Sequence, residues 1–338
     1  MQKNVEKYLI LFASCVPVKG AYRATICDLQ RCNYEFIPND LADLLLKFNG
    51  SKLKAIYDFY GTENKDVIDE YLNFLLSKEY IFFTDNPISF PKINFEFDTP
   101  NKITYSIIDY SSKNNYKLSN VISQIDELGC YFLQFRSFDE LPNSKLLEFS
   151  MLMKNSRIRG VDLIVKYSQK QSMDFFNELF KSNLRIKNIT VHSAIENKVI
   201  TNIDGTILTY AEQVITDHSH CGNVSPEYFS INMKSFPENL HYNSCLNKKI
   251  SIDINGKIKN CPSMNMDFGN INKIKLKDVI DNKNFKKTWM INKDKILICK
   301  DCEFRYICTD CRAYIETPEN IYSKPLKCGY DPYSGKWK

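Results

Sequence analysis

Residues 299–311 read Cys299-Lys-Asp-Cys302-Glu-Phe-Arg-Tyr-Ile-Cys308-Thr-Asp-Cys311. The stretch contains two C-x2-C pairs separated by five residues, and Cys328 follows downstream. In a C-x2-C pair, one tight turn brings two thiolates to the same metal centre. The stretch therefore predicts that the C-terminal part of the chain binds metal.

The cysteines are unevenly distributed along the chain. Of the 12 cysteines in 338 residues, four are scattered over the first 220 residues. The other eight are Cys221, Cys245, Cys261, Cys299, Cys302, Cys308, Cys311 and Cys328. In a cytoplasmic protein such a cluster indicates metal ligands rather than a disulfide framework. Eight ligands make two sites of four.

Two of these cysteines flank a predicted hairpin. Residues 250–254 alternate like a strand, Asn255-Gly256 is a hairpin turn signal, and residues 257–260 return. Cys245 and Cys261 stand at the two ends of this segment. We expect the hairpin to bring both thiolates together at its base.

The region from about Asn243 to Lys338 resembles a SPASM domain. The features that carry the resemblance are the hairpin between two cysteines, Cys261-Pro262, Phe268-Gly269-Asn270-Ile271, Trp289 and the final cysteine pattern. Such domains lie at the C-terminus of radical SAM peptide-maturing enzymes and usually hold two auxiliary [4Fe-4S] clusters. The third gap of the family pattern is often three residues, whereas here it is two.

The resemblance implies an interleaved set of ligands. Cys299, Cys302, Cys308 and Cys328 would hold the second cluster, and Cys245, Cys261 and Cys311 three corners of the first. Cys221 is the remaining candidate for the fourth corner, and His218 or His220 is an alternative nitrogen ligand. Structural zinc is the alternative metal, because four-cysteine spacing alone fits zinc as well. We expect Phe268, Trp289 and Phe304 in the core of this domain.

The middle of the chain, residues 96–240, alternates short apolar runs with amphipathic stretches. We expect strands at residues 103–108, 130–135, 161–167, 189–192 and 206–210, and helices at residues 118–128, 144–154 and 173–180. This order predicts an α/β fold with βα units on a parallel sheet. It resembles the partial (β/α) barrel of radical SAM enzymes, which a SPASM domain would follow.

The motif that defines radical SAM enzymes is missing from this barrel-like region. Their C-x3-C-x2-C follows the first strand, where this chain reads Asp109-Tyr-Ser-Ser-Lys-Asn-Asn-Tyr116. The expected Gly-Gly-Glu run is replaced by Arg136-Ser-Phe-Asp-Glu140. A SAM-cleaving cluster needs three thiolates and one open iron site. We therefore expect a degenerate barrel that does not cleave SAM and serves as a scaffold or peptide-binding surface.

Residues 1–95 have a different pattern. We expect a turn at residues 16–20, a hairpin at residues 24–37, helices at residues 41–48, 53–60 and 66–77, and a closing strand at residues 80–83. This layout resembles the winged-helix domain that binds leader peptides in peptide maturation, as an added strand at a sheet edge. Cys15, Cys27 and Cys32 are expected to be buried or incidental rather than a third metal site.

The whole chain resembles the grasp-with-SPASM family, whose members are encoded beside an ATP-grasp ligase. The resemblance rests on Cys15-Val-Pro-Val-Lys-Gly-Ala21, Cys27-Asp-Leu-Gln-Arg31, Tyr34 and Ile37-Pro38, together with the lost SAM-binding cysteines. It implies a SPASM domain at residues 241–338 and a partner ligase that forms ester or amide links in a short precursor peptide. The chain would then be an accessory maturation protein.

Two other functions stay open at this point. The first is a redox enzyme that acts on the precursor peptide through its auxiliary clusters, to which Asp139, Glu140 and His192 are possible contributors. For each of these three residues a structural role is the simpler interpretation, and for Asp139 and Glu140 that role is an exposed loop. The second alternative is a zinc-stabilised interaction protein.

Composition excludes other classes of protein. The net charge of +5 and the acidic third helix, with Asp66, Asp69 and Glu70, argue against a nucleic-acid partner. No apolar run approaches the roughly 20 residues that span a bilayer, and the start lacks the features of a signal peptide. The sequence predicts a cytoplasmic protein without a membrane partner.

Overall fold

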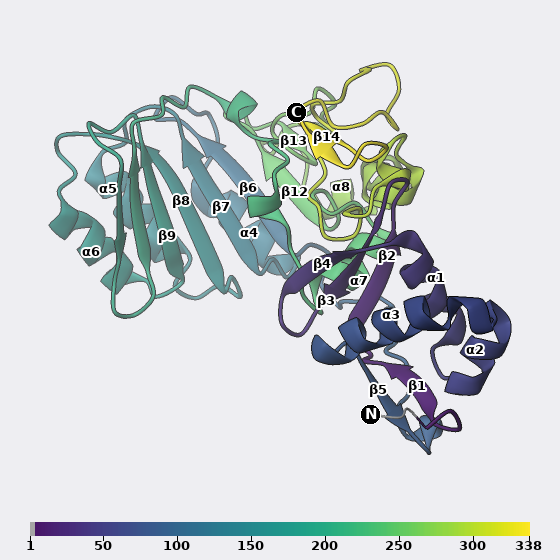
Figure 1. The fold of residues 1–338 in the computed structure, drawn as a ribbon. Coiled ribbons are helices and arrows are strands. Elements are labelled where there is room, and N and C mark those ends of the chain that lie inside the picture. Colours follow the sequence, from purple (N-terminus) through teal and green to yellow (C-terminus); the bar gives the residue numbers. More distant parts are fainter. Residues whose placement is uncertain (1–3) are drawn as a thin grey trace.

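The computed structural model describes residues 4–338 (Figure 1). Its N-terminal part contains two small antiparallel sheets. One sheet has three strands: β2 (Cys15–Lys19), β3 (Ala24–Asp28) and β4 (Asn33–Ile37). The other pairs β1 (Tyr8–Leu11) with β5 (Ile81–Thr84), which joins the start of this part to its end.

Three helices fill the sequence between β4 and β5, as the sequence predicts. They are α1 (Asn39–Phe48), α2 (Leu53–Tyr60) and α3 (Lys65–Ser77). Each is amphipathic, and the apolar sides pack with the strands in one core. The chain leaves α1 through Gly50, which has a φ of +88° that favours glycine.

The prediction of a turn at residues 16–20 is wrong, because these residues belong to strand β2. Pro17 suggested the turn, since proline lacks the N–H that a sheet needs. Within the described residues β2 pairs with β3 alone, and an edge strand tolerates proline. Val18 is buried on this strand with only 1% of its surface exposed.

The centre of the molecule is an eight-stranded sheet with the order β10-β11-β9-β8-β7-β6-β12-β13. The parallel strands of the middle region are β6 (Tyr105–Tyr110), β7 (Phe132–Ser137), β8 (Gly160–Lys166), β9 (Ile186–His192) and β11 (Ile207–Ala211). The predicted parallel α/β sheet is confirmed. The edge strand β10 (Lys198–Thr201) is antiparallel to β11 and was not predicted.

Three helices connect the first four strands of the middle region. They are α4 (Leu118–Glu127), α5 (Asn143–Leu152) and α6 (Met173–Ser182). They lie on one side of the sheet (Figure 1), and their buried side chains share a core with alternate strand residues such as Val161, Leu163 and Val165. Among residues 4–338, no helix is both long and apolar enough to cross a membrane.

The sheet continues beyond the middle region into the cysteine-rich part. β12 (Lys249–Ile252) pairs in parallel with β6 and antiparallel with β13 (Ile258–Lys259). The predicted hairpin is thus present, with shorter strands than expected. Asp253 accepts hydrogen bonds from the amides of Asn255 and Lys257, and Gly256 takes a φ of +75°. Because β12 pairs with β6, backbone hydrogen bonds cross the domain boundary expected between residues 240 and 241.

Most of the remaining C-terminal chain consists of turns. Its regular elements are α7 (Ser235–His241), α8 (Leu276–Asp281), α9 (Lys283–Lys286), β14 (Tyr330–Asp331) and β15 (Lys336–Trp337). The rings of Phe268 and Trp289 both pack against Phe285, and Phe304 is 2% exposed. The aromatic residues therefore stabilise this part as core residues.

Candidate functional site

The hairpin β12–β13 positions two of the predicted ligands. Cys245 lies shortly before β12 and Cys261 shortly after β13. Burial raises the pKa of the Cys261 thiol to about 12, and the thiols of Cys245 and Cys221 add to this increase. The three sulfur atoms therefore share one neighbourhood, although Cys221 is separated from Cys245 by helix α7.

Cys311 joins the same neighbourhood from the C-terminal turns. Burial raises the pKa of its thiol, and the Cys245 thiol contributes to the increase. A Cβ atom at Gly222 would stand 2.9 Å from the sulfur of Cys311, and Gly222 has a φ of +90°. The glycine after Cys221 thus allows this close approach. We call Cys221, Cys245, Cys261 and Cys311 the first tetrad.

The other four predicted ligands form a second neighbourhood. Burial raises the pKa of Cys308 to about 12, and the thiols of Cys328 and Cys299 contribute. Burial also raises the pKa of Cys302, again with contributions from Cys308 and Cys299. We call Cys299, Cys302, Cys308 and Cys328 the second tetrad. The structure brings together the residues of each tetrad, while their role as ligands stays a prediction.

A lysine faces each tetrad, and Lys293 is buried whereas Lys249 is half-buried. Lys293 is 4% exposed, and its Nζ lies 3.9 Å from the sulfur of Cys308 and 4.0 Å from that of Cys299. Lys249 Nζ lies 3.3 Å from the sulfur of Cys245. A buried ammonium group is stable only beside compensating negative charge. The donor set therefore fits an anionic, thiolate-bound centre in each tetrad.

In the part of the chain that the structure describes, no three Cys, His, Asp or Glu side chains form a group that could hold a single metal ion. In a [4Fe-4S] cluster, each thiolate binds a different iron, so the ligands stand further apart than around one ion.

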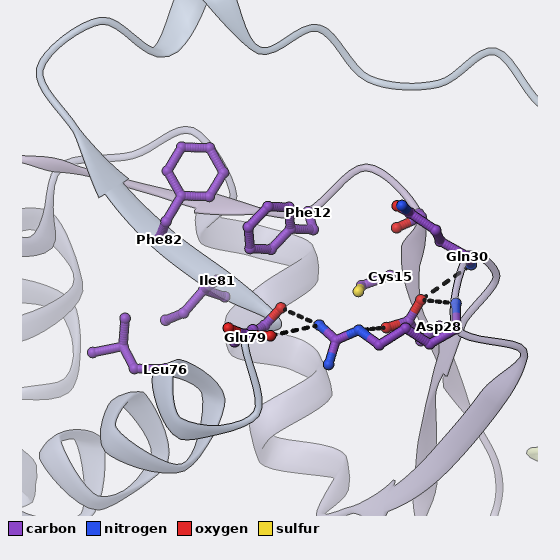
Figure 2. A pocket seen from close by; sticks show the side chains of 10 residues that line it. Phe12, Cys15, Asp28, Gln30, Leu76, Glu79, Ile81 and Phe82 are labelled. Atoms are coloured by element: carbon purple, nitrogen blue, oxygen red, sulfur yellow. Dashed lines mark hydrogen bonds and ion pairs between the residues drawn. The ribbon is translucent and has the colours of Figure 1, made fainter.

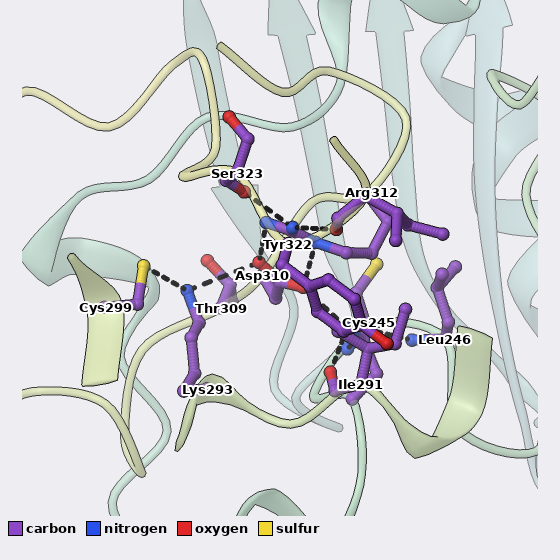
Figure 3. A network of polar contacts seen from close by, with 12 residues as sticks. Cys245, Leu246, Ile291, Lys293, Cys299, Thr309, Asp310, Arg312, Tyr322 and Ser323 are labelled. Atoms are coloured by element: carbon purple, nitrogen blue, oxygen red, sulfur yellow. Dashed lines mark hydrogen bonds and ion pairs between the residues drawn. The ribbon is translucent and has the colours of Figure 1, made fainter. Parts of the chain in front are cut away.

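A buried polar network connects the two tetrads (Figure 3). At its centre is Asp310, which lies between Cys308 and Cys311 in the sequence and whose side chain is 1% exposed. Arg312 Nη2 donates to Oδ1 at 2.8 Å, Arg312 Nε forms an ion pair with Oδ2 at 2.7 Å, and Lys293 Nζ lies 3.4 Å from Oδ1. These two cations and burial have opposite effects on Asp310: burial would raise its pKa, and the cations hold it below the usual value.

Asn243 extends this network to the first tetrad. Its side-chain amide donates to Asp310, and its side-chain oxygen accepts hydrogen bonds from the backbone amides of Cys245 and Leu246. Sequence reasoning missed Asn243, Lys249, Lys293, Asp310 and Arg312. The one available signal was a charged residue inside the second C-x2-C pair.

A cavity of about 440 Å³ lies between strand β7 and the first tetrad. Its wall includes Gln134 and Arg136 from β7, Cys221 and Cys245 from the tetrad, and His218 and His220. His218 is hydrogen-bonded to the hydroxyl of Tyr314 at 3.2 Å, while His220 is exposed. A ligand of moderate size in this cavity would contact both the sheet and the tetrad.

The carboxyl ends of β6 and β7 carry a buried ion pair. Arg136 contacts the carboxylate of Asp109 through two nitrogens, and both side chains are at least 94% buried. Asp109 is the first residue of the stretch 109–116, which contains no cysteine. Arg136 also lines the 440 Å³ cavity, so the charge that it presents there is already paired with Asp109.

The three possible catalytic residues have structural contacts. Asp139 accepts hydrogen bonds from Ser111, Ser112 and Ser137, and so fastens the loop after β6 to β7. His192 is fully buried, with Nε2 3.0 Å from the carbonyl oxygen of Ser137. Glu140 is exposed.

The N-terminal part contains a second hollow region, shown in Figure 2. Two adjoining cavities of about 440 and 590 Å³ share Phe12, Ser14, Gln30 and Phe82 in their walls. The ring of Phe82 packs against Phe12 and Phe90, at centroid distances of 4.9 and 4.7 Å. At the polar end, Arg31 forms ion pairs with Asp28 and Glu79.

Comparison with known proteins identifies a domain in the C-terminal part of the chain. Residues 244–303 match the family model of the SPASM domain, described as an iron–sulfur cluster-binding domain. The chain therefore contains a SPASM domain, and this domain indicates iron–sulfur cluster binding. The matched range includes Cys245, Cys261, Cys299 and Cys302. No curated protein sequence matched the chain.

Solved structures give a weaker likeness. The chain resembles Streptococcus suis SuiB bound to S-adenosylmethionine at 12% identity and a TM-score of 0.38, over 94% of this chain and 98% of that one. It resembles SuiB bound to the precursor peptide SuiA at 10% identity and a TM-score of 0.29, over 90% of this chain and 96% of that one.

Proposed function

We propose that the chain is an accessory maturation protein for a ribosomally made, post-translationally modified peptide. Its C-terminal part binds two [4Fe-4S] clusters, the first through Cys221, Cys245, Cys261 and Cys311 and the second through Cys299, Cys302, Cys308 and Cys328. The observation that carries this proposal is the presence of two thiol tetrads, each with a lysine ammonium group within 4.0 Å of a sulfur atom. When bound, the clusters supply a structural cross-link or one-electron redox chemistry.

The middle sheet acts as a degenerate radical SAM-like barrel that positions the peptide and does not cleave SAM. The Asp109–Arg136 pair at the carboxyl ends of β6 and β7 supports this role, because it provides no thiolate for a SAM-binding cluster. The cavity between β7 and the first tetrad offers space for a peptide side chain.

The N-terminal part is a winged-helix domain that binds the leader of the precursor peptide. Within the described residues, β5 pairs with β1 alone, so the outer edge of β5 has free backbone groups for an added strand. The aromatic hollow beside it would take apolar leader side chains. The family resemblance adds a partner ATP-grasp ligase, which forms the new bonds in the precursor.

A redox enzyme is the second candidate function. The observation that favours it is that the 440 Å³ cavity borders Cys221 and Cys245 of the first tetrad. A bound peptide would then be adjacent to the first cluster. Electron exchange with the peptide needs such proximity.

Anaerobic incubation with SAM, dithionite and precursor peptide tests the proposal. The accessory role predicts no 5′-deoxyadenosine, an unmodified peptide in the absence of the ligase, and saturable binding of the leader by fluorescence anisotropy. Formation of 5′-deoxyadenosine would contradict it. A peptide oxidised without SAM would favour the redox enzyme instead.

A further inference from the structure

We propose that Lys249 and Lys293 each compensate the charge of one cluster and thereby set the reduction potentials of the two clusters independently. The inference rests on the proposed function only for the presence of the clusters. It assigns roles to two residues outside the ligand set, each acting through the thiolates that it contacts.

Lys293 belongs to the second tetrad. Its side chain is 4% exposed and its Nζ approaches the sulfur atoms of both Cys299 and Cys308. Burial lowers the pKa of Lys293, but the thiols of Cys308 and Cys299 and the carboxylate of Asp310 raise it above the usual value. The charge of Arg312 lowers it. Asp310 holds the ammonium group in place from the opposite side, at 3.4 Å.

Lys249 belongs to the first tetrad and has a simpler environment. Its Nζ contacts the sulfur of Cys245 at 3.3 Å and lies 4.9 Å from the centre of the Tyr105 ring. Among residues 4–338, no carboxylate lies within 4.0 Å of this ammonium group. The Cys245 thiolate is therefore the closest negative charge to this ammonium group.

The direction of the effect follows from electrostatics. Reduction adds one negative charge to a cluster, and a nearby cation stabilises the reduced form more than the oxidised form. Lys293 is buried and Lys249 is half-buried, so solvent screens their contacts with the sulfur atoms, at 3.3 to 4.0 Å, less than contacts on the surface. Charge and hydrogen bonds at the sulfur atoms are known determinants of cluster potentials. Removal of either lysine charge should therefore lower the potential of its own cluster.

The test is a redox titration, followed by electron paramagnetic resonance, of the full chain purified without oxygen. Lys249→Met should lower the midpoint of one cluster signal, and Lys293→Met that of the other. We expect the reduction equilibrium to fall at least about tenfold, a shift of about 59 mV for one electron. Lys248→Met is the matched control, because Lys248 Nζ donates to the carbonyls of Thr99 and Asn101 instead of a thiol.

Charge-conserving variants distinguish the loss of the lysine charge from the loss of a cluster. If a methionine variant loses about half of its iron, the matching Lys→Arg variant should retain the iron and the wild-type midpoint. Equal iron loss in both variants would overturn the inference, as would unchanged midpoints, a common shift of both signals, or a shift in the Lys248→Met control. Absence of iron from the wild type would overturn the proposed function itself, and is detected before any variant is titrated.

Discussion

Arg136 holds Asp109 in a two-point ion pair, with Nε 2.6 Å from Oδ1 and Nη2 2.9 Å from Oδ2. The two residues are direct partners in the register of the parallel strands β6 and β7. Their side chains are 6% and 2% exposed, so each charge depends on the other. The pair therefore fixes the carboxyl edge of the sheet between β6 and β7.

Arg136→Met should destabilise the fold by about 3–5 kcal/mol, because it leaves the carboxylate of Asp109 buried without a cation. Urea unfolding under anaerobic conditions measures this change. The double variant Asp109→Leu/Arg136→Met removes both charges and should recover most of the loss. A single variant as stable as the wild type would show that the pair does not stabilise this edge.

Arg23→Met should weaken the contact between the N-terminal part and the cysteine-rich part, and so lower the free energy of unfolding. Arg23 Nε lies 3.0 Å from the Glu303 carboxylate, which is fully buried beside Cys302. We expect a loss of about 2 kcal/mol, since a buried carboxylate loses its cation while Tyr330 still donates to it. Lys54→Met, which breaks an exposed pair with Asp58, should change the free energy of unfolding by under about 0.5 kcal/mol. A loss of stability in Arg23→Met no larger than that in Lys54→Met would show that the Arg23–Glu303 pair does not stabilise the fold.

Cys302→Ala should remove the second cluster and halve the iron content, from about eight to about four atoms per chain. Iron and sulfide analysis of the purified variants measures this. Cys130→Ala is the control, because the Cys130 thiol is buried elsewhere and contacts the carbonyl of Phe132. An unchanged iron content in Cys302→Ala would remove this residue from the ligand set.

His192 should make stability depend on pH below neutrality. Burial lowers the pKa of His192, and the charges of Lys166 and His220 lower it further. As the pH falls, His192 takes up a proton near the ordinary pKa of about 6.5 in the unfolded chain, and only at a lower pH in the folded chain. The contribution is fully present above pH 6.5 and is lost as the pH falls through the folded pKa.

Urea unfolding at several pH values between 5 and 7.5 checks this dependence. The free energy of unfolding of the wild type should fall toward pH 5 more steeply than that of His192→Gln. His241→Gln is the control, because His241 is exposed. Parallel curves for the wild type and His192→Gln would contradict the assignment.

The sequence allowed the order of the elements to be predicted, because periodicity and turn residues act locally. The helix at residues 53–60 is observed with the same bounds, and the hairpin around Asn255-Gly256 is present. Strand β2 was missed because Pro17 is tolerated only through its edge position, which depends on pairing. Strand β10 was missed because Val199 is exposed and the segment lacks a buried face.

The supporting residues of the site could not be predicted in the same way. Lysine is almost always exposed, so a sequence gives no reason to place Lys249 or Lys293 beside a thiol. Asp109 and Arg136 are 27 residues apart, and only the strand register makes them partners. The cysteine spacing of residues 299–311, by contrast, is a local signal, whereas Cys221 was named only as the remaining candidate for the first tetrad.

The most direct test of the account is the iron, sulfide and zinc content of protein purified without oxygen, together with its visible spectrum. The account predicts about eight irons and eight sulfides per chain, with broad absorption near ~400 nm, for two thiolate-bound clusters. One or two zinc ions and a colourless protein would contradict it and leave a zinc-stabilised interaction protein.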